Sequence, residues 1–274
     1  MKMKTKNFSS VILLIVIFCI PSFVNSQVVY STKFKPPQVN IEVLFSYAQP
    51  FPNMYGTVSD FFAFKNYGVK NGLPGAQVNV KLTADKKGRI LPYLSLGYNL
   101  FYGKDNGTAF IDSNIINSGY PLPGSTQYNT VSGSSKIYLH NFNAGLGFSY
   151  AFTNKSRWTP HLDAELDLNM LFGTYRQTPY NTGETSFTIK NAARFGFGVG
   201  AGIKVRITKA FGLAFTTKYK FANVLGKNSE RIFEQNKMTL LDKANTGING
   251  NLSKDRHIQY IEVLLGVSFY IGRK

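Results

Sequence analysis

The chain has 274 residues with 31 Lys and Arg against 14 Asp and Glu, and charged residues make up only 16% of it. A soluble domain usually carries about 25% charged residues, so an ordinary soluble enzyme is not the default interpretation. Aromatic residues reach 15%, and the chain has 25 glycines and a single Cys. A collagen-like chain is excluded because the glycines have no triplet period, and a disulfide-stapled chain is excluded because one Cys has no partner within the chain.

The first residues are typical of a secretory signal peptide. Lys2, Lys4 and Lys6 form a basic start, residues 11–20 are apolar, and residues 21–26 contain the small residues expected before a cleavage site. The apolar run of ten residues is shorter than the roughly 20 that a membrane-spanning helix needs, so we expect cleavage after residue 26.

From residue 37 onward the hydrophobic pattern has a period of two, which predicts β-strands with two chemically different faces. Eight such runs can be delimited, namely 39–49, 75–84, 90–103, 136–153, 159–178, 193–208, 211–225 and 257–272. Short turns at 85–89, 154–158 and 208–210 alternate with long polar connections at 50–74, 104–135, 179–192 and 226–256. Short turns at one end and long loops at the other are typical of bacterial outer-membrane barrels.

The two faces of the predicted strands differ sharply in charge. One face of each strand is apolar, for example Val39, Ile41, Val43, Phe45 and Tyr47 in the first, and none of the 44 positions assigned to this face is charged. The other face carries eleven charged residues, namely Glu42, Lys81, Asp163, Glu165, Asp167, Arg194, Lys204, Arg206, Lys218, Lys220 and Glu262. A Lys or Arg facing lipid near the bilayer midplane costs roughly 2 to 4 kcal/mol, whereas a barrel lumen tolerates charge. We therefore expect the apolar face to meet lipid and the charged face to line the lumen.

These features resemble the family of small outer-membrane β-barrels that includes OmpX, the transmembrane domain of OmpA and the PorT-like barrels. The resemblance covers about residues 37 to 274 and is architectural. It implies an all-β, eight-stranded antiparallel up-and-down transmembrane barrel, preceded by a signal peptide (1–26) and a periplasmic segment (27–36). In the last strand, Leu265, Val267, Phe269 and Ile271 match the alternating signal that the barrel assembly machinery reads in this family.

An eight-stranded barrel is just wide enough for side chains to fill its interior. We therefore expect the eleven lumen charges to form a paired network that fills the lumen, with a passive path for ions or small solutes as the alternative. Gly196, Gly198, Gly200 and Gly202 repeat at every second position of one strand, with no helix after them, so a nucleotide-binding loop is not indicated. We interpret these glycines as space for long side chains that cross the lumen.

The sequence gives only weak signs of a catalytic or metal-binding site. His140, His161 and His257 lie on different predicted strands without metal-ligand spacing, and Ser134 and Ser135 before His140 are not oriented by any motif. We predict no enzymatic activity, no metal, no cofactor and no nucleic-acid partner. The formal net charge of +17 is distributed over turns, loops and lumen, and we expect outer-membrane lipid and lipopolysaccharide as partners, together with an unidentified extracellular ligand.

Two predictions concern the long loops. The loop cations are expected to contact anionic lipopolysaccharide, and they are Lys104, Lys227, Arg231, Lys237, Lys243, Lys254 and Arg256. The segment 230–244 has apolar residues that predict either a short amphipathic helix or binding lip, or a loop that packs on itself, and they are Ile232, Phe233, Met238, Leu240 and Leu241. A soluble lipocalin-like barrel with its apolar face inward is the remaining alternative for the fold. The aromatic residues near the strand ends favour the membrane barrel.

Overall fold

The computed structural model describes residues 36–62, 65–107, 109–111, 129–153, 156–180, 183–229, 236–247, 250–253 and 255–272. The predicted signal peptide and most of the predicted periplasmic segment lie outside these residues. Within the described part of the chain, no helix is long and apolar enough to cross a membrane.

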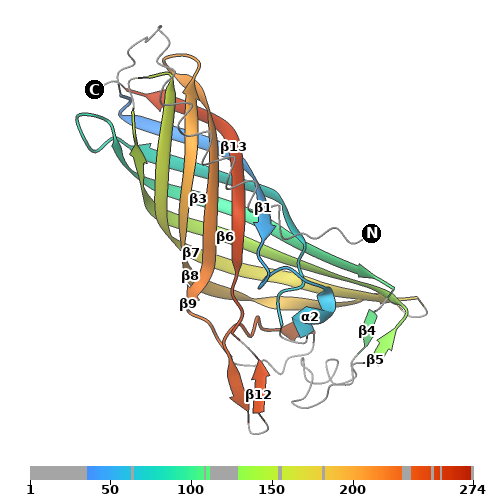
Figure 1. Ribbon diagram of the computed structural model, residues 1–274. Coiled ribbons are helices and arrows are strands. Elements are labelled where there is room, and N and C mark those ends of the chain that lie inside the picture. The colour runs from blue at the N-terminus through green and yellow to red at the C-terminus, as the bar shows by residue number, and fades with distance from the viewer. Residues whose placement is uncertain are drawn as a thin grey trace, which may run out of the picture. The chain divides into compact units, whose positions relative to one another are not determined.

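Eight long strands form one closed antiparallel sheet (Figure 1). They are β1 (Val39–Pro50), β2 (Asn71–Leu82), β3 (Ile90–Asn106), β6 (Gly133–Ala151), β7 (Trp158–Pro179), β8 (Thr185–Arg206), β9 (Phe211–Leu225) and β13 (Gln259–Ile271). Each pairs with its neighbours along the chain, and β1 pairs with β13 to close the ring. The eight-stranded antiparallel barrel predicted from the sequence is confirmed.

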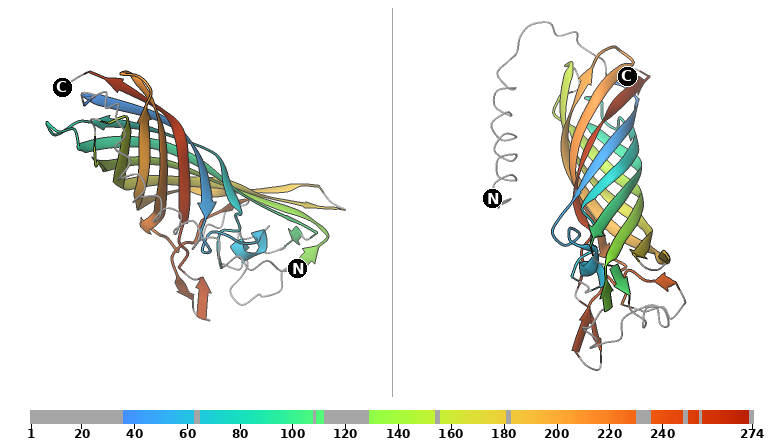
Figure 2. Two further views of the ribbon diagram at one scale, coloured as in Figure 1. Left: turned by 45° about the horizontal axis from the view of Figure 1, so that its top comes forward. Right: turned by 90° about the vertical axis from the view of Figure 1, so that its right-hand side faces the viewer.

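Small elements decorate the long-loop end of the barrel. They are α2 (Val58–Phe62), β4 (Ala109–Ile111), β5 (Asn129–Val131), β10 (Lys237–Met238), β11 (Asn245–Gly247) and β12 (Gly250–Ser253). β4 pairs with β5 and β11 with β12, while β10 adds two residues in parallel to the edge of β8. Figure 2 shows α2 and these short strands gathered at one end of the barrel, and the C-terminus of the chain, marked C, lies at the other end.

One strand begins well before the point that the sequence pattern predicts. β8 has 22 residues and begins at Thr185, where the pattern predicts a start at residue 193, while β6 and β7 lie within three residues of their predicted bounds. The prediction of a loop at 179–192 is therefore wrong for residues 185–192, which form the first part of β8.

The physical reason for this error is a reversal of polarity along the strands. On β7 the inward side chains change from Asp167 and Asn169 to Leu171 and Tyr175, while the outward side chains change from Phe172 to Thr174 and then Arg176. β8 does the same, because Phe187 and Ile189 are buried and Thr188 and Lys190 are exposed. On β8 the search for an apolar outer face therefore stops where that face becomes polar, although the strand itself continues. The run predicted for β7 already crosses the reversal on its own strand, to residue 178.

Candidate functional site

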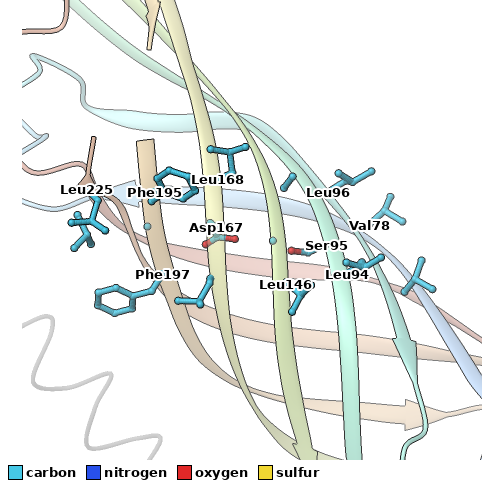
Figure 3. Close-up of a pocket in the computed structure, with 16 residues that line it drawn as sticks. Val78, Leu94, Ser95, Leu96, Leu146, Asp167, Leu168, Phe195, Phe197 and Leu225 are labelled. Carbon is cyan, nitrogen blue, oxygen red and sulfur yellow. The ribbon is translucent and has the colours of Figure 1, made fainter. Parts of the chain in front are cut away.

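The outer wall of the barrel is apolar on all eight strands. Phe45 is 75% exposed, Leu166 72%, Leu146 61% and Leu265 60%. An apolar hollow on this wall is lined by residues of β2, β3, β6, β7, β8 and β9, and the side chains labelled there include Val78, Leu94, Leu96, Leu146, Leu168, Phe195 and Phe197 (Figure 3). Soluble monomers rarely expose continuous apolar surface on this scale, so the wall requires an apolar surrounding.

The structure buries all eleven of the charged residues that the sequence assigns to the lumen. None is more than 5% exposed. Buried charges require partners, and most of these residues have them.

The first group of charges surrounds Glu42 and lies toward the short turns. Lys204 Nζ is 2.8 Å from Glu42 Oε1, and Lys81 Nζ lies 3.3 Å from both Glu42 Oε2 and Asp163 Oδ1. Asn40 and Asn79 each donate a side-chain hydrogen bond to Glu42. Two lysines and two amides therefore satisfy one carboxylate inside the barrel.

The second group surrounds Glu165, near the middle of β7. Lys218 Nζ lies 3.0 Å from Glu165 Oε2, and Lys220 bridges Glu165 and Asp167, at 2.9 Å from Asp167 Oδ2. The Tyr93 hydroxyl donates to Glu165 Oε2 at 2.9 Å. β7 supplies the acids and β9, two strands along the ring, supplies the bases. Tyr93 belongs to β3, which lies four strands from β9 in the ring of eight, so with Tyr93 this group crosses the lumen.

Three of the eleven residues lie outside these two groups. Arg206 stacks over the ring of Tyr270, with 4.4 Å from its guanidinium carbon to the ring centroid. Glu262 accepts a hydrogen bond from Asn99 Nδ2 at 2.9 Å. Arg194 pairs with Asp242, a loop residue that lies outside the alternating pattern of the strands.

The strand glycines make room for the lumen side chains, as interpreted from the sequence. A Cβ on Gly198 would lie 2.9 Å from Lys220 Cδ, one on Gly200 2.6 Å from Lys218 Cγ, and one on Gly202 2.7 Å from His161 Cε1. These three glycines therefore permit the long side chains of neighbouring strands to cross the lumen. At Gly196 and Gly202 the nearest atom is a backbone oxygen, that of Phe221 and of Phe215 respectively.

Above the charged section, the lumen is closed by a second, apolar core, which we call the cap. It joins residues of the first and last long loops to the inward side chains at the upper ends of the strands. The loop members are Met54, Val58, Phe61, Tyr67, Val69, Met238, Leu240, Leu241 and Ile258, and the strand members include Phe101, Ile137, Leu139, Leu171, Tyr175, Phe187, Ile189 and Tyr260. All are at most 3% exposed.

The cap settles the choice left open for the last loop. Met238, Leu240 and Leu241 are buried in it, so they pack inward as the self-packing interpretation expected, but against the first loop and the strands as well as their own loop. The prediction of an amphipathic helix or lip is wrong for these residues, since Met238 belongs to β10 and the other two lie in irregular chain. Ile232 and Phe233 lie outside the described residues.

Arg256 is the polar centre of the cap. Its guanidinium donates to the carbonyl oxygens of Phe61, Asn66 and Leu241 at 3.2, 2.9 and 3.1 Å and also to that of Leu240. It lies 4.7 Å from the ring centroid of Tyr67. The prediction that Arg256 contacts lipopolysaccharide is wrong, because its side chain is 1% exposed and satisfies carbonyls of both loops.

Asp242 forms a second polar contact within the cap. Its carboxylate accepts two hydrogen bonds from Arg194 at 2.8 Å each, one from Asn223 Nδ2 at 3.0 Å and one from the backbone N–H of Asn228 at 3.0 Å. Burial alone would raise the pKa of the Asp242 carboxyl, but these hydrogen bonds and the Arg194 charge outweigh it and hold that pKa below its ordinary value. The signal that could have found Asp242 is an acid inside an apolar loop segment, where an unpaired charge is costly.

The three histidines and the predicted assembly residues lie at separate places in the barrel. His140 faces outward, where its Nδ1 is 2.7 Å from the Tyr98 hydroxyl and its ring stacks on Phe172. His161 Nε2 lies 3.6 Å from Asp163 inside the barrel, and His257 Nδ1 is 2.9 Å from Lys227 Nζ. No cluster of three or more His, Cys, Asp or Glu that could hold a metal occurs among the described residues. The predicted assembly residues lie on the outer side of β13 between β1 and β9, and they are Leu265, Val267, Phe269 and Ile271.

No family model and no curated protein matches the sequence. Among solved structures, the chain is similar to Neisserial surface protein A, with 14% identity over 85% of this chain and 96% of that one and a TM-score of 0.39. It is also similar to Ail of Yersinia pestis in complex with the heparin analogue sucrose octasulfate, with 9% identity over 84% and 96% of the two chains and a TM-score of 0.35.

A further similarity is to the N-terminal β-barrel domain of Pseudomonas aeruginosa OprF, with 11% identity over 85% of this chain and 98% of that one and a TM-score of 0.34. All three are small outer-membrane β-barrel proteins. The likeness is one of fold, and the eight-stranded closure of this chain rests on the register of its own strands.

Proposed function

We propose that the chain is an integral protein of the bacterial outer membrane, exported by its N-terminal signal peptide. In this proposal it acts as a filled barrel that presents four long extracellular loops and has no catalytic site. One observation carries the proposal, namely that the outer wall is apolar while the charges are buried and paired inside. Only a chain surrounded by hydrocarbon gains from this inverted arrangement.

The filled lumen favours a structural or interactive role over the alternative of a passive channel. A conducting path needs water along its length, but the acids of β7 meet the lysines of β9 at salt-bridge distance and the Tyr93 hydroxyl of β3 at hydrogen-bond distance inside the lumen. Above them the cap adds an apolar core. Contact with an extracellular ligand would therefore take place at the outer surface of the loops and cap.

Partners follow from the same placement. The apolar wall would be covered by outer-membrane lipid, and β13 would be presented to the barrel assembly machinery during insertion. The lumen network Glu42, Lys81, Asp163, Glu165, Asp167, Lys204, Lys218 and Lys220 would act as a rigid internal brace.

The test is the behaviour of the purified chain on SDS gels and in membrane fractions. We expect a folded form that migrates differently from the boiled form and that stays in the outer-membrane fraction after carbonate extraction. A chain that is released by carbonate and shows no heat-dependent mobility would contradict the proposal and favour the soluble barrel.

A further inference from the structure

Three cations stand in one row across neighbouring strands, near the upper edge of the outer wall. Lys104 of β3 is the direct cross-strand partner of Lys136 of β6, and Lys136 is the direct partner of Arg176 of β7. Gly103, Ser135, Ile137, Tyr175 and Gln177, which flank them along the chain, are all buried. All three charges therefore point outward from the barrel, and we call them the basic row.

This arrangement is electrostatically unfavourable in the protein alone. Directly opposed residues have Cβ atoms roughly 4.5–5.5 Å apart, and like charges in these positions destabilise a sheet. In the described part of the chain, Lys104 and Lys136 form no salt bridge, and Arg176 has Glu184 at 3.5 Å, with both side chains about half exposed. One exposed acid faces three bases, so the row carries an excess of positive charge that an added anion would neutralise.

The position of the row relative to the aromatic residues indicates where that negative charge comes from. One rung below it are the paired residues Tyr102 and Tyr138, whose ring centroids are 5.1 Å apart. The next rung holds His140 and Phe172, stacked at 4.9 Å. Aromatic residues with polar edges are typical of the membrane–water interface. Two residues along a strand span about 7 Å, which places the basic row at the level of lipid headgroups.

We propose that the basic row binds the headgroup of an outer-leaflet lipid that carries two phosphates. The row spans two gaps between strands, about 10 Å at the usual strand spacing, so it matches two anionic groups better than one. Arg176 can hold one phosphate with two parallel hydrogen bonds, and the two lysines supply point charges to the other. The inference rests on the proposed placement in the outer membrane.

A lipid fits the row better than a soluble polyanion because of what lies directly beneath it. Below the aromatic rungs the same three strands present Leu96, Phe142 and Leu168, which are 55%, 45% and 39% exposed. These side chains need acyl chains against them. Headgroup and acyl-chain contacts are therefore continuous on one face formed by β3, β6 and β7.

The experiment compares the full chain with two matched triple variants in lipid nanodiscs. One variant neutralises the row through Lys104→Gln, Lys136→Gln and Arg176→Gln. The control neutralises three exposed cations at the opposite end through Lys86→Gln, Lys87→Gln and Arg89→Gln. Heat-dependent gel mobility is measured first for all three proteins, so a failure of the membrane proposal is recognised separately.

Binding is then measured by native mass spectrometry with diphosphoryl lipid A, monophosphoryl lipid A, phosphatidylglycerol and inorganic phosphate as probes. We expect diphosphoryl lipid A to bind best, to lose about tenfold in affinity in the row variant and to bind the control like the wild type. Equal loss in both variants, no loss in the row variant, or equal binding of the one-phosphate lipids would overturn the proposal. Displacement of the lipid by inorganic phosphate at similar concentration would show that the row takes a free anion, which also contradicts it.

Discussion

Arg256 holds two loops to each other through carbonyl groups rather than through an acid. Phe61 and Asn66 belong to the first long loop, and Leu240 and Leu241 belong to the last. A hydrogen bond from a charged donor contributes about 1.5–3 kcal/mol, and removal of the donor leaves buried carbonyls unpaired. The stability of the cap therefore depends on one side chain that nothing in the local sequence distinguishes from the other loop cations.

We predict that Arg256→Met opens the cap while the barrel stays folded. Limited proteolysis of the protein in lipid vesicles should show new cuts within residues 51–70 and 236–258, at rates at least about tenfold higher than in the wild type. Lys65→Met, which removes an exposed cation from the same loop, is the control and should leave the cutting pattern unchanged. Protection of both loops in Arg256→Met would mean that the apolar contacts suffice without the guanidinium.

Asp242 gives the cap a dependence on acid pH. A carboxyl whose pKa is lower in the folded state than in the unfolded state stabilises the fold above its unfolded pKa, near 3.9, and this contribution is lost as pH falls through the folded pKa. We predict that pepsin cuts the loops of the wild type increasingly as the pH is lowered below about 4. The Asp242→Asn variant is compared with the wild type at each pH, which cancels the pH dependence of pepsin itself. Cleavage of the variant should change little further over that range. An unchanged slope in the variant would assign the effect to other carboxyls.

At the scale of the strands, the period-two pattern was sufficient to predict the fold. Eight runs, their order and their inward charges followed from alternation alone, because one face must avoid charge. The ion-pair partners of those charges could not be predicted from alternation. Lys220 meets Glu165 and Asp167, while Arg194 turns to Asp242, and these choices depend on cross-lumen distances that alternation does not encode. The upper part of β8 was missed because its polarity is reversed, and the cap was missed because its residues come from separate loops.

The glycines of β8 give a test at this scale. Gly200→Ala would place a Cβ 2.6 Å from Lys218 Cγ and 2.7 Å from the backbone oxygen of Thr217. We predict a loss of about 1–3 kcal/mol in the free energy of unfolding, measured by urea titration in lipid vesicles. Gly183→Ala, at a position with no atom within 4 Å, is the matched control and should change little. An unchanged urea midpoint for Gly200→Ala would show that Lys218 can relax away from Glu165 at no cost.

For the molecule as a whole, the filled lumen predicts electrical silence. The refolded mature protein in a planar bilayer should give no stable conductance steps, and Glu42→Gln with Glu262→Gln should remain silent, because other side chains still fill the lumen. Heat-dependent gel mobility of the same preparations confirms that folded protein was tested. Stable steps that change in size with the double variant would establish a path through the lumen and favour the channel.

The reversal of polarity along β3, β6 and β7 also determines how deeply the protein is immersed. A shift outward by one rung would bring Phe172 and Tyr138 into water, and a shift inward would draw Lys136 and Arg176 into hydrocarbon. Both moves are unfavourable, so the free energy of the protein has a narrow minimum with respect to its depth in the bilayer. In a bilayer of another thickness, the lipids around this protein should stretch or compress to meet it, because the barrel has no inexpensive way to slide.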